Sequence, residues 1–141
     1  MPHHVSQVAE QAILFRNDTI LLLHHTKRGS YQLPGGRLDQ GEDGGEGLIR
    51  EIREETGFEM EIDDFTLFAT KVIDREHEIK YGVFYVGRTP EGDVTIDHPH
   101  NSYTWANRNE VEDLTLMFPE TRAILNRAFD QRLTFFENTS K

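Results

Sequence analysis

Three glutamates in the middle of the chain, Glu51, Glu54 and Glu55, have the spacing of side chains that share one face of a helix. The surrounding segment has helical periodicity, with Leu48, Ile49 and Ile52 in one apolar sector. Carboxylate oxygens are the ligands that hard divalent cations prefer, and Mg²⁺ completes its shell with water and substrate phosphate. The spacing is therefore compatible with a site for a divalent metal ion.

An ordinary solvent-exposed charged face would explain the same glutamates. Arg50 can form ion pairs with Glu46 or Glu54 at i, i+4, each worth under ~0.5 kcal/mol. On a helical wheel, however, Arg50 and Arg53 fall in a different sector from the three glutamates. We therefore expect both arginines to be turned away, which leaves the carboxylates repelling one another unless a cation binds. Geometry alone leaves both interpretations open.

The segment 36–58, GRLDQGEDGGEGLIREIREETGF, resembles the Nudix box. That pattern has a glycine, any five residues, a glutamate, any seven, Arg-Glu, an aliphatic residue, any one, Glu-Glu, any one, a glycine and a bulky apolar residue. Every fixed position is matched in this chain, by Gly36, Glu42, Arg50, Glu51, Ile52, Glu54, Glu55, Gly57 and Phe58. The Leu33–Gly36 lead-in and the order of flanking elements extend the resemblance over most of residues 8–131.

The resemblance implies a hydrolase that cleaves a nucleoside diphosphate linked to another moiety, with Mg²⁺ or Mn²⁺ as its cofactor. It implies Glu51, Glu54 and Glu55 as catalytic metal ligands, with the carbonyl group of Gly35 or Gly36 as a further ligand. Glu51 or Glu55 is alternatively the group that orients or deprotonates the attacking water. Metal ions that neutralise developing charge are what phosphoryl transfer needs.

The resemblance also implies structural roles for three box residues. Glu42 and Arg50 look like the pair that ties the loop to the helix. Gly57 stands where a left-handed residue ends a helix. Gly47 departs from the usual alanine, and a glycine inside a helix costs about 1 kcal/mol, so we expect the first turn to fray or begin late.

Weaker candidates lie beyond the box. Several family members use an acidic residue from a distal loop as base or ligand, and the matching region 91–101 offers Asp97, which leads a polar loop. Asp93, His98 and His100 are alternatives, and ordinary loop residues would explain all of them. A zinc site from the two histidines is disfavoured because no cysteine or obvious third ligand accompanies them.

Three residues before the box are candidates for substrate contacts. Lys27 and Arg28 can reach substrate phosphates, although exposed turn residues would look the same. Tyr31 can stack on a base, or it can simply pack near the following Leu33–Pro34.

Composition limits the remaining possibilities. The 141 residues carry 15 basic and 25 acidic side chains, a formal net charge of −10, and no cysteine. This balance argues against nucleic-acid polymers and membranes as partners, and the missing cysteine excludes thiol catalysis and disulfides. No segment resembles a signal peptide or a membrane span. We expect one domain over residues 1–141, cytoplasmic, a monomer or a homodimer, with a small-molecule nucleotide substrate.

The elements that must position these residues follow from periodicity and turn signals. The Asn17-Asp18 turn joins the first two strands, and Asp43 with Glu46 completes a capping box before the helix. The expected order is strands 8–16 and 19–26, loop 27–42, helix 44–56, strands 59–73, 77–89, 94–96 and 103–106, and a helix from Pro119 to about Gln131. This order predicts an α/β (α+β) fold in which a mixed sheet is sandwiched between helices.

Two functions of different classes remain. The first is a metal-dependent pyrophosphohydrolase whose substrate is a nucleoside triphosphate or modified nucleotide, as in MutT-like enzymes, or a nucleotide sugar. The second is a non-catalytic Nudix-fold module that senses a nucleotide. The complete set of box carboxylates favours the enzyme.

Overall fold

The computed structural model describes residues 3, 6–75, 78–97 and 99–136, and the structural statements below concern that part of the chain. Its elements, in chain order, are β1 (Gln7–Arg16), β2 (Thr19–His25), β3 (Ser30–Gln32), β4 (Gly35–Arg37), α1 (Gly44–Thr56), the 3₁₀ turn η1 (Ile62–Asp64), β5 (Phe65–Arg75), β6 (Glu78–Arg88), β7 (His100–Ala106), α2 (Arg108–Asp113) and α3 (Thr121–Phe136). Within these described residues, no helix is long and apolar enough to span a membrane.

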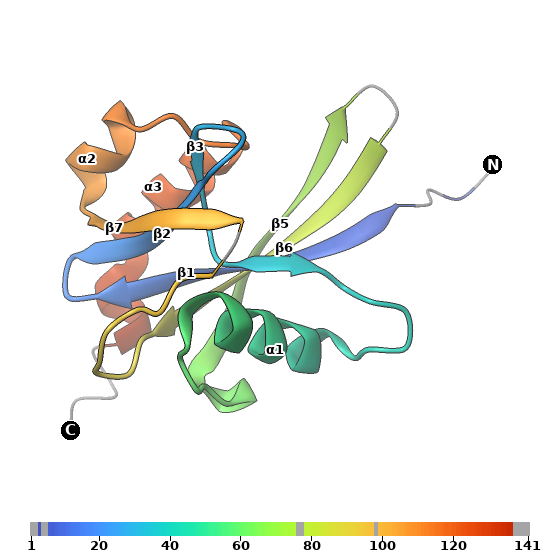
Figure 1. Ribbon diagram of the computed structural model, residues 1–141, viewed down its shortest axis with the longest axis horizontal. Coiled ribbons are helices and arrows are strands. Elements are labelled where there is room, and N and C mark those ends of the chain that lie inside the picture. Colours follow the sequence, from blue (N-terminus) through green and yellow to red (C-terminus); the bar gives the residue numbers. More distant parts are fainter. Residues whose placement is uncertain (1–2, 4–5, 76–77, 98, 137–141) are drawn as a thin grey trace.

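The strands form one mixed sheet with the order β3-β2-β1-β6-β5, in which β4 also pairs with β1 and β7 with β2. The central strands β1 and β6 are parallel, from Gln7 opposite Lys80 to Phe15 opposite Arg88. The other pairs are antiparallel. β1 has two partners along its other edge, because its start lies beside β4 and its end beside β2. This places the short strand β4 next to helix α1 (Figure 1).

Alternation along β1 divides the core into two layers. Ile13 and Phe15 face a cluster that includes side chains of α2 and α3. Ala12 and Leu14 face the opposite cluster, to which α1 contributes Leu48 and Ile52. Helices therefore cover both faces of a mixed sheet (Figure 1), which confirms the expected fold class.

Helix α1 has the bounds that the sequence predicts, and its first turn does not begin late. Gly57 adopts φ 80° and donates its N–H to the Arg53 carbonyl oxygen at 2.9 Å, as the left-handed C-cap requires. The predicted capping box at the other end is wrong, because the Asp43 side chain makes no capping hydrogen bond. The buried carboxylate of Glu10 lies beside the first turn instead, close to Gly44.

The remaining differences from the expected elements have local causes. Residues 94–96 do not form a strand, because the Thr95 N–H donates to the carbonyl oxygen of Thr56 and holds this segment against the end of α1. The predicted strand from residue 59 begins only at Phe65, after η1. Two short strands, β3 and β4, lie within the expected loop 27–42.

The C-terminal part holds two further differences. Helix α2 was not expected, although Asn107 and Glu110 satisfy each other's backbone N–H groups in a capping box that the sequence shows. Helix α3 begins at Thr121 and not at Pro119, and it extends to Phe136. Its last turn packs on the body of the same chain, where the Phe136 ring meets that of Phe15 at 5.8 Å between centroids.

Candidate active site

Helix α1 and strand β4 meet at two glycines. Gly35 and Gly36 pair with Gln11 and Glu10 of β1. Gly35 has φ +142°, and a side chain there would collide with the backbone of Glu10. A Cβ atom on Gly36 would lie 2.8 Å from the carboxyl carbon of Glu51. The two glycines therefore allow the helix carboxylates to approach the backbone of β4 directly.

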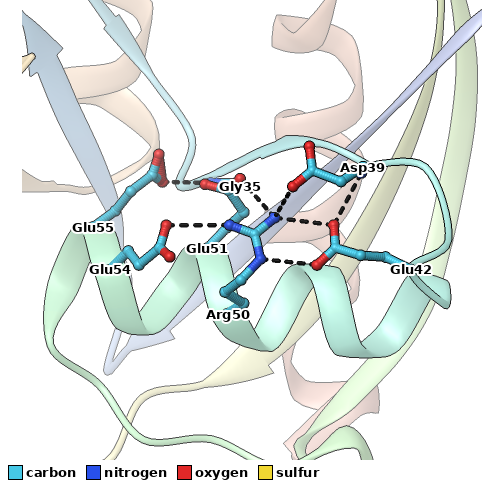
Figure 2. A network of polar contacts seen from close by, with 7 residues as sticks. All are labelled: Gly35, Asp39, Glu42, Arg50, Glu51, Glu54 and Glu55. Atoms are coloured by element: carbon cyan, nitrogen blue, oxygen red, sulfur yellow. Dashed lines mark hydrogen bonds and ion pairs between the residues drawn. The ribbon is translucent and has the colours of Figure 1, made fainter.

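Glu55 is the most strongly perturbed carboxyl group at this junction. The Gly35 N–H donates a hydrogen bond of 2.8 Å to its Oε2 (Figure 2). The pKa of Glu55 is nevertheless raised to about 8. Burial is the largest cause, the Gly35 hydrogen bond acts against it, and the charges of Glu51 and Glu54 add to it. A cation bound beside this carboxyl group would stabilise its ionised form.

Glu51 lies between Glu55 and the arginine on the same helix. Its side chain is 20% exposed, and burial raises its pKa, while the nearby Arg50 acts in the opposite direction. One carboxylate oxygen lies 3.3 Å from Nη2 of Arg50, and the carboxyl group occupies the space that a side chain on Gly36 would fill. Glu51 is thus the second acidic group facing β4.

Arg50 is not turned away, which corrects the expectation from the helical wheel. Its guanidinium group donates two hydrogen bonds to Glu42, at 2.8 and 3.0 Å, and one to Asp39 at 3.2 Å (Figure 2). It also reaches Glu54 at 3.2 Å. The long side chain bends back over one helical turn, a freedom that a wheel drawn from Cα positions does not represent. Arg50 therefore relieves part of the repulsion that a cation was expected to relieve.

The bidentate contact supports the expected structural pair. The hydrogen bonds from Arg50, together with one from the Asp39 backbone N–H, lower the pKa of Glu42 to about 2. In the same way, Glu42 raises the pKa of Arg50. Arg53, by contrast, turns away as expected and pairs with Glu59 at 2.8 Å. The loop before α1 is therefore tied to the helix by a permanently charged pair.

Glu54 is the most accessible of the three box glutamates on this face. Its side chain is 58% exposed, and its only described ion pair is with Arg50. Within the described residues, no three His, Asp or Glu side chains are already gathered as a complete set of metal ligands. The donor chemistry nevertheless fits a hard cation, because the partly buried Glu51 and Glu55 face β4 and the accessible Glu54 projects from the same helix beside them (Figure 2).

Glu10 is an acidic residue that the sequence analysis missed. Its side chain is 3% exposed, and burial raises its pKa. The Tyr85 hydroxyl group donates to Oε2 at 3.2 Å, and Oε1 has no hydrogen-bond partner in the described structure. A Cβ atom on Gly47 would lie 3.3 Å from that oxygen. Leu38 and Glu42 lie closer still, at 2.9 and 3.2 Å, so the three side chains together leave little room for a Cβ atom at this point of α1. The only sequence signal was a lone acid within an apolar strand.

A cavity of about 150 Å³ opens beside the two glycines of β4. Polar and cationic groups line it from separate strands: Gln11 from β1, Gln32 from β3 and Lys80 from β6. Its apolar walls include Leu33, Ile73, Met117 and Phe118. Sequence reasoning missed this cavity because its walls come from distant segments that only the sheet topology brings together.

The distal-loop candidates do not form one group. Asp97 is exposed and follows the segment that Thr95 holds against Thr56. His98 lies outside the described residues. His100 is 6% exposed, and its Nε2 lies 2.7 Å from the amide nitrogen of Gln32. It is therefore a buried residue at the start of β7 and does not belong to an open loop.

The three residues expected to contact the substrate, Lys27, Arg28 and Tyr31, lie outside the cavity beside β4. Lys27 and Arg28 are exposed in the turn between β2 and β3, where their backbone N–H groups donate to Nδ1 of His25. Tyr31 is partly buried, and its ring meets that of His24 edge-on at 4.9 Å. None of the three lines the cavity beside β4.

Comparison with known proteins gives a consistent result. The NUDIX domain model matches residues 6–129. The uncharacterized Nudix hydrolase YvcI of Bacillus subtilis (strain 168) is 26% identical over 113 residues, which cover 78% of this chain and 72% of that protein. A MutT-like protein of Streptomyces ambofaciens is 36% identical over 66 residues, 46% of this chain and 42% of its own length.

Solved structures agree on the fold. The MutT Nudix hydrolase of Burkholderia pseudomallei superposes with a TM-score of 0.77 at 25% identity, covering 87% of this chain and 98% of that one. The Ap4A hydrolase of C. elegans has a TM-score of 0.76 at 21% identity, covering 92% of this chain and 99% of its own, and this likeness concerns the fold alone.

Proposed function

This chain belongs to the Nudix family of hydrolases, and from that premise we propose that it hydrolyses the pyrophosphate bond of a nucleoside diphosphate linked to a second group. The single observation that carries the proposal is the junction of α1 with β4, where Gly35 holds Glu55 and Gly36 leaves room for Glu51. Burial and mutual repulsion raise the pKa values of these carboxyl groups, and a bound cation would offset both effects. Such a cluster is therefore typical of a cation-binding functional site. We propose one catalytic domain over residues 1–141.

Glu51, Glu54 and Glu55 would hold the metal, together with the carbonyl group of Gly35 or Gly36. A bound Mg²⁺ or Mn²⁺ supplies neutralisation of the phosphate charge and activation of water. The chain's own contribution is to keep two of these carboxyl groups partly dehydrated and oriented toward β4. Such groups favour a cation over a proton once the pH approaches their raised pKa values.

The catalytic base would come from the same set. Glu55 has its pKa raised to about 8, within the range in which a carboxyl group exchanges protons near neutral pH. Glu51, held between Arg50 and β4, is the alternative. Asp97 remains the proposed distal acid, because its loop is held against the C-terminal end of α1.

The base of the nucleotide would occupy the cavity beside β4. Gln11 and Gln32 offer amide groups that can read the polar edge of a base, and the Lys80 ammonium group lies 5.1 Å from the centre of the Phe118 ring. These residues are better placed for substrate than Lys27, Arg28 and Tyr31, because the cavity adjoins Gly35 and Gly36. Among these three residues, we propose only the exposed Lys27 and Arg28 as substrate contacts, to the phosphates that lie farthest from the nucleoside.

A nucleoside triphosphate or a modified nucleotide is the substrate that we favour. The matched proteins named MutT-like or MutT support this choice. A nucleotide sugar is the second candidate, and an Ap4A hydrolase with the same fold adds dinucleoside polyphosphates to the compounds worth testing.

The test is release of phosphate and pyrophosphate from a panel of nucleoside triphosphates, oxidised nucleotides, nucleotide sugars and dinucleoside polyphosphates, with Mg²⁺ or Mn²⁺. Wild type is compared with Glu54→Gln, which removes the accessible carboxylate, and with Glu46→Gln, which removes one exposed charge from the same helix. We expect turnover that requires metal, falls at least about 100-fold in Glu54→Gln and is retained in Glu46→Gln.

Two results would contradict the proposal. Turnover that is insensitive to both metal and Glu54→Gln would exclude the carboxylate mechanism. Measurable nucleotide binding without any turnover on the panel would instead support the alternative, a Nudix-fold module that senses a nucleotide.

A further inference from the structure

A second pocket, of about 520 Å³, lies at the far end of β1. We call it the arginine pocket; it is lined by Phe15, Arg16 and Asn17 of the β1–β2 hairpin, by residues 88–92 after β6, and by Arg132 and Phe136 of α3. Gly36 of the box pairs with Glu10, six residues before Arg16. At about 3.3 Å per residue of strand, the two places are about 20 Å apart. The arginine pocket is therefore separate from the candidate active site.

Arg16 forms a rigid wall of this pocket. Its Nε donates to Oγ1 of Thr89 at 3.2 Å and its Nη2 to the carbonyl oxygen of Pro90 at 2.7 Å. Its guanidinium plane also lies 4.5 Å from the centre of the Trp105 ring. These contacts hold the group in place and leave its charge without a carboxylate partner among the described residues.

Two further guanidinium groups face the same space. Arg88 lies over the ring of Phe136, 4.7 Å from its centre, and forms no ion pair within the described residues. Arg132 approaches from α3 and pairs with the highly exposed Asp18 at 2.8 Å. An exposed pair of this kind is weak and exchanges readily with a competing anion.

The charge of the lining contrasts with that of the chain. Three of the lining residues are arginines and one, Glu91, is acidic, whereas the whole chain has a net charge of −10. Concentrating like charges in one concave place is unfavourable unless an anion neutralises them. Guanidinium groups match phosphate oxygens in geometry and bind them with paired hydrogen bonds.

We propose that the arginine pocket is a second, non-catalytic site that binds a diphosphate group. With three arginines against the single acid Glu91, the lining has an excess of positive charge that favours a diphosphate, and the volume is within the range of small-molecule sites. Free pyrophosphate and the phosphates of a nucleotide share this chemistry. Phe15 and Phe136 add an apolar wall that would favour a nucleotide over the free anion.

The experiment is isothermal titration calorimetry of the full chain with inorganic pyrophosphate, and separately with ADP, in EDTA. Without divalent cations the box carboxylates repel both ligands, so the result does not depend on the proposed hydrolase activity. The test variants are Arg88→Gln and Arg132→Gln. Arg127→Gln is the matched control, because it removes the same charge from an exposed position on α3 outside the pocket.

We expect one saturable site whose Kd increases at least about 10-fold in each test variant and less than about 2-fold in Arg127→Gln. Tighter binding of ADP than of pyrophosphate would identify a nucleotide as the ligand, and equal binding would identify the free diphosphate. Three results would overturn the proposal: no saturable binding below 10 mM (about the limit of a specific site), unchanged affinity in both test variants, or equal weakening by Arg127→Gln. As a control, the Tm of each variant is compared with that of the wild type to verify that the variant is folded.

Discussion

Replacing Glu55 with glutamine should stabilise the metal-free protein at neutral and alkaline pH. Burial holds the pKa of Glu55 at about 8 in the folded chain, whereas in the unfolded chain the pKa has its ordinary value of 4.5. Between these values the folded protein retains a proton that the unfolded chain has lost. The wild type therefore loses stability as the pH rises from about 4.5 to about 8, and the loss is constant above that range.

The size of the effect follows from the same two values. At about 1.4 kcal/mol per pH unit, a rise from 4.5 to about 8 corresponds to at most about 5 kcal/mol. Local relaxation reduces this ceiling, and we expect Glu55→Gln to gain at least about 2 kcal/mol of unfolding free energy at pH 8. The glutamine oxygen can still accept the Gly35 hydrogen bond, so the substitution changes charge more than packing.

The assay is urea unfolding in EDTA at pH 5 to 9, followed by the fluorescence of the single tryptophan, Trp105, which is partly buried. The difference between Glu55→Gln and wild type should grow from pH 5 to pH 8 and then level off. Glu46→Gln, an exposed position on the same helix, should change stability by under about 0.5 kcal/mol without this pH trend.

A destabilised Glu55→Gln variant, or a gain in stability that is independent of pH, would show that burial of the ionised Glu55 does not destabilise the fold. Adding Mg²⁺ provides a separate check on the proposed metal site. A cation that binds only the folded wild type stabilises it by mass action, so the advantage of the variant should shrink as the Mg²⁺ concentration rises.

Three further predictions concern the same helix and loop. Because Arg50 lowers the pKa of Glu42 to about 2, their ion pair stabilises the fold above pH 4.5, and this stabilisation is lost as the pH falls toward 2. In urea unfolding at a series of pH values, the free energy of unfolding of Glu42→Gln should therefore decrease less between pH 4.5 and pH 2 than that of the wild type. Gly36→Ala places a Cβ atom 2.8 Å from the Glu51 carboxyl carbon, so the flexible end of the Glu51 side chain must move aside. We expect this displacement to lower kcat at least about 10-fold and to change Tm by under about 2 °C. Gly47→Ala should change the free energy of unfolding by under about 1 kcal/mol in urea unfolding, because the helix-propensity gain of about 1 kcal/mol is offset by the shift that a Cβ atom 2.9 Å from Cδ1 of Leu38 requires.

The box helix could be predicted from sequence because its determinants are local. Apolar residues recur at helical spacing, and Leu48 and Ile52 are fully buried as the pattern requires, with Ile49 partly so. Gly57 ends the helix because a left-handed residue is needed there. Such features depend on a few neighbouring residues, so the chain does not need to be folded in three dimensions to reveal them.

The surroundings of the helix could not be predicted in the same way. Arg50 reaches residues in the preceding loop and in the next turn, through a side chain whose conformation no periodicity fixes. Glu10 meets Gly47 only because β1 passes under the first turn of α1. The cavity beside β4 combines side chains more than a hundred positions apart, from Ala9 to Phe118. Each of these depends on long-range packing.

The carboxyl groups around α1 differ in role because they differ in partners. Glu42 faces the guanidinium group of Arg50, which keeps it ionised even in acid, so it has no tendency to take up a proton or a second cation. Glu55 has one backbone N–H and two like-charged neighbours, and burial raises its pKa to about 8. An acid that already has its cation serves structure, whereas an acid that is buried without one is available for binding and chemistry. The same helix can therefore hold its loop in place and still present unsatisfied charge toward β4.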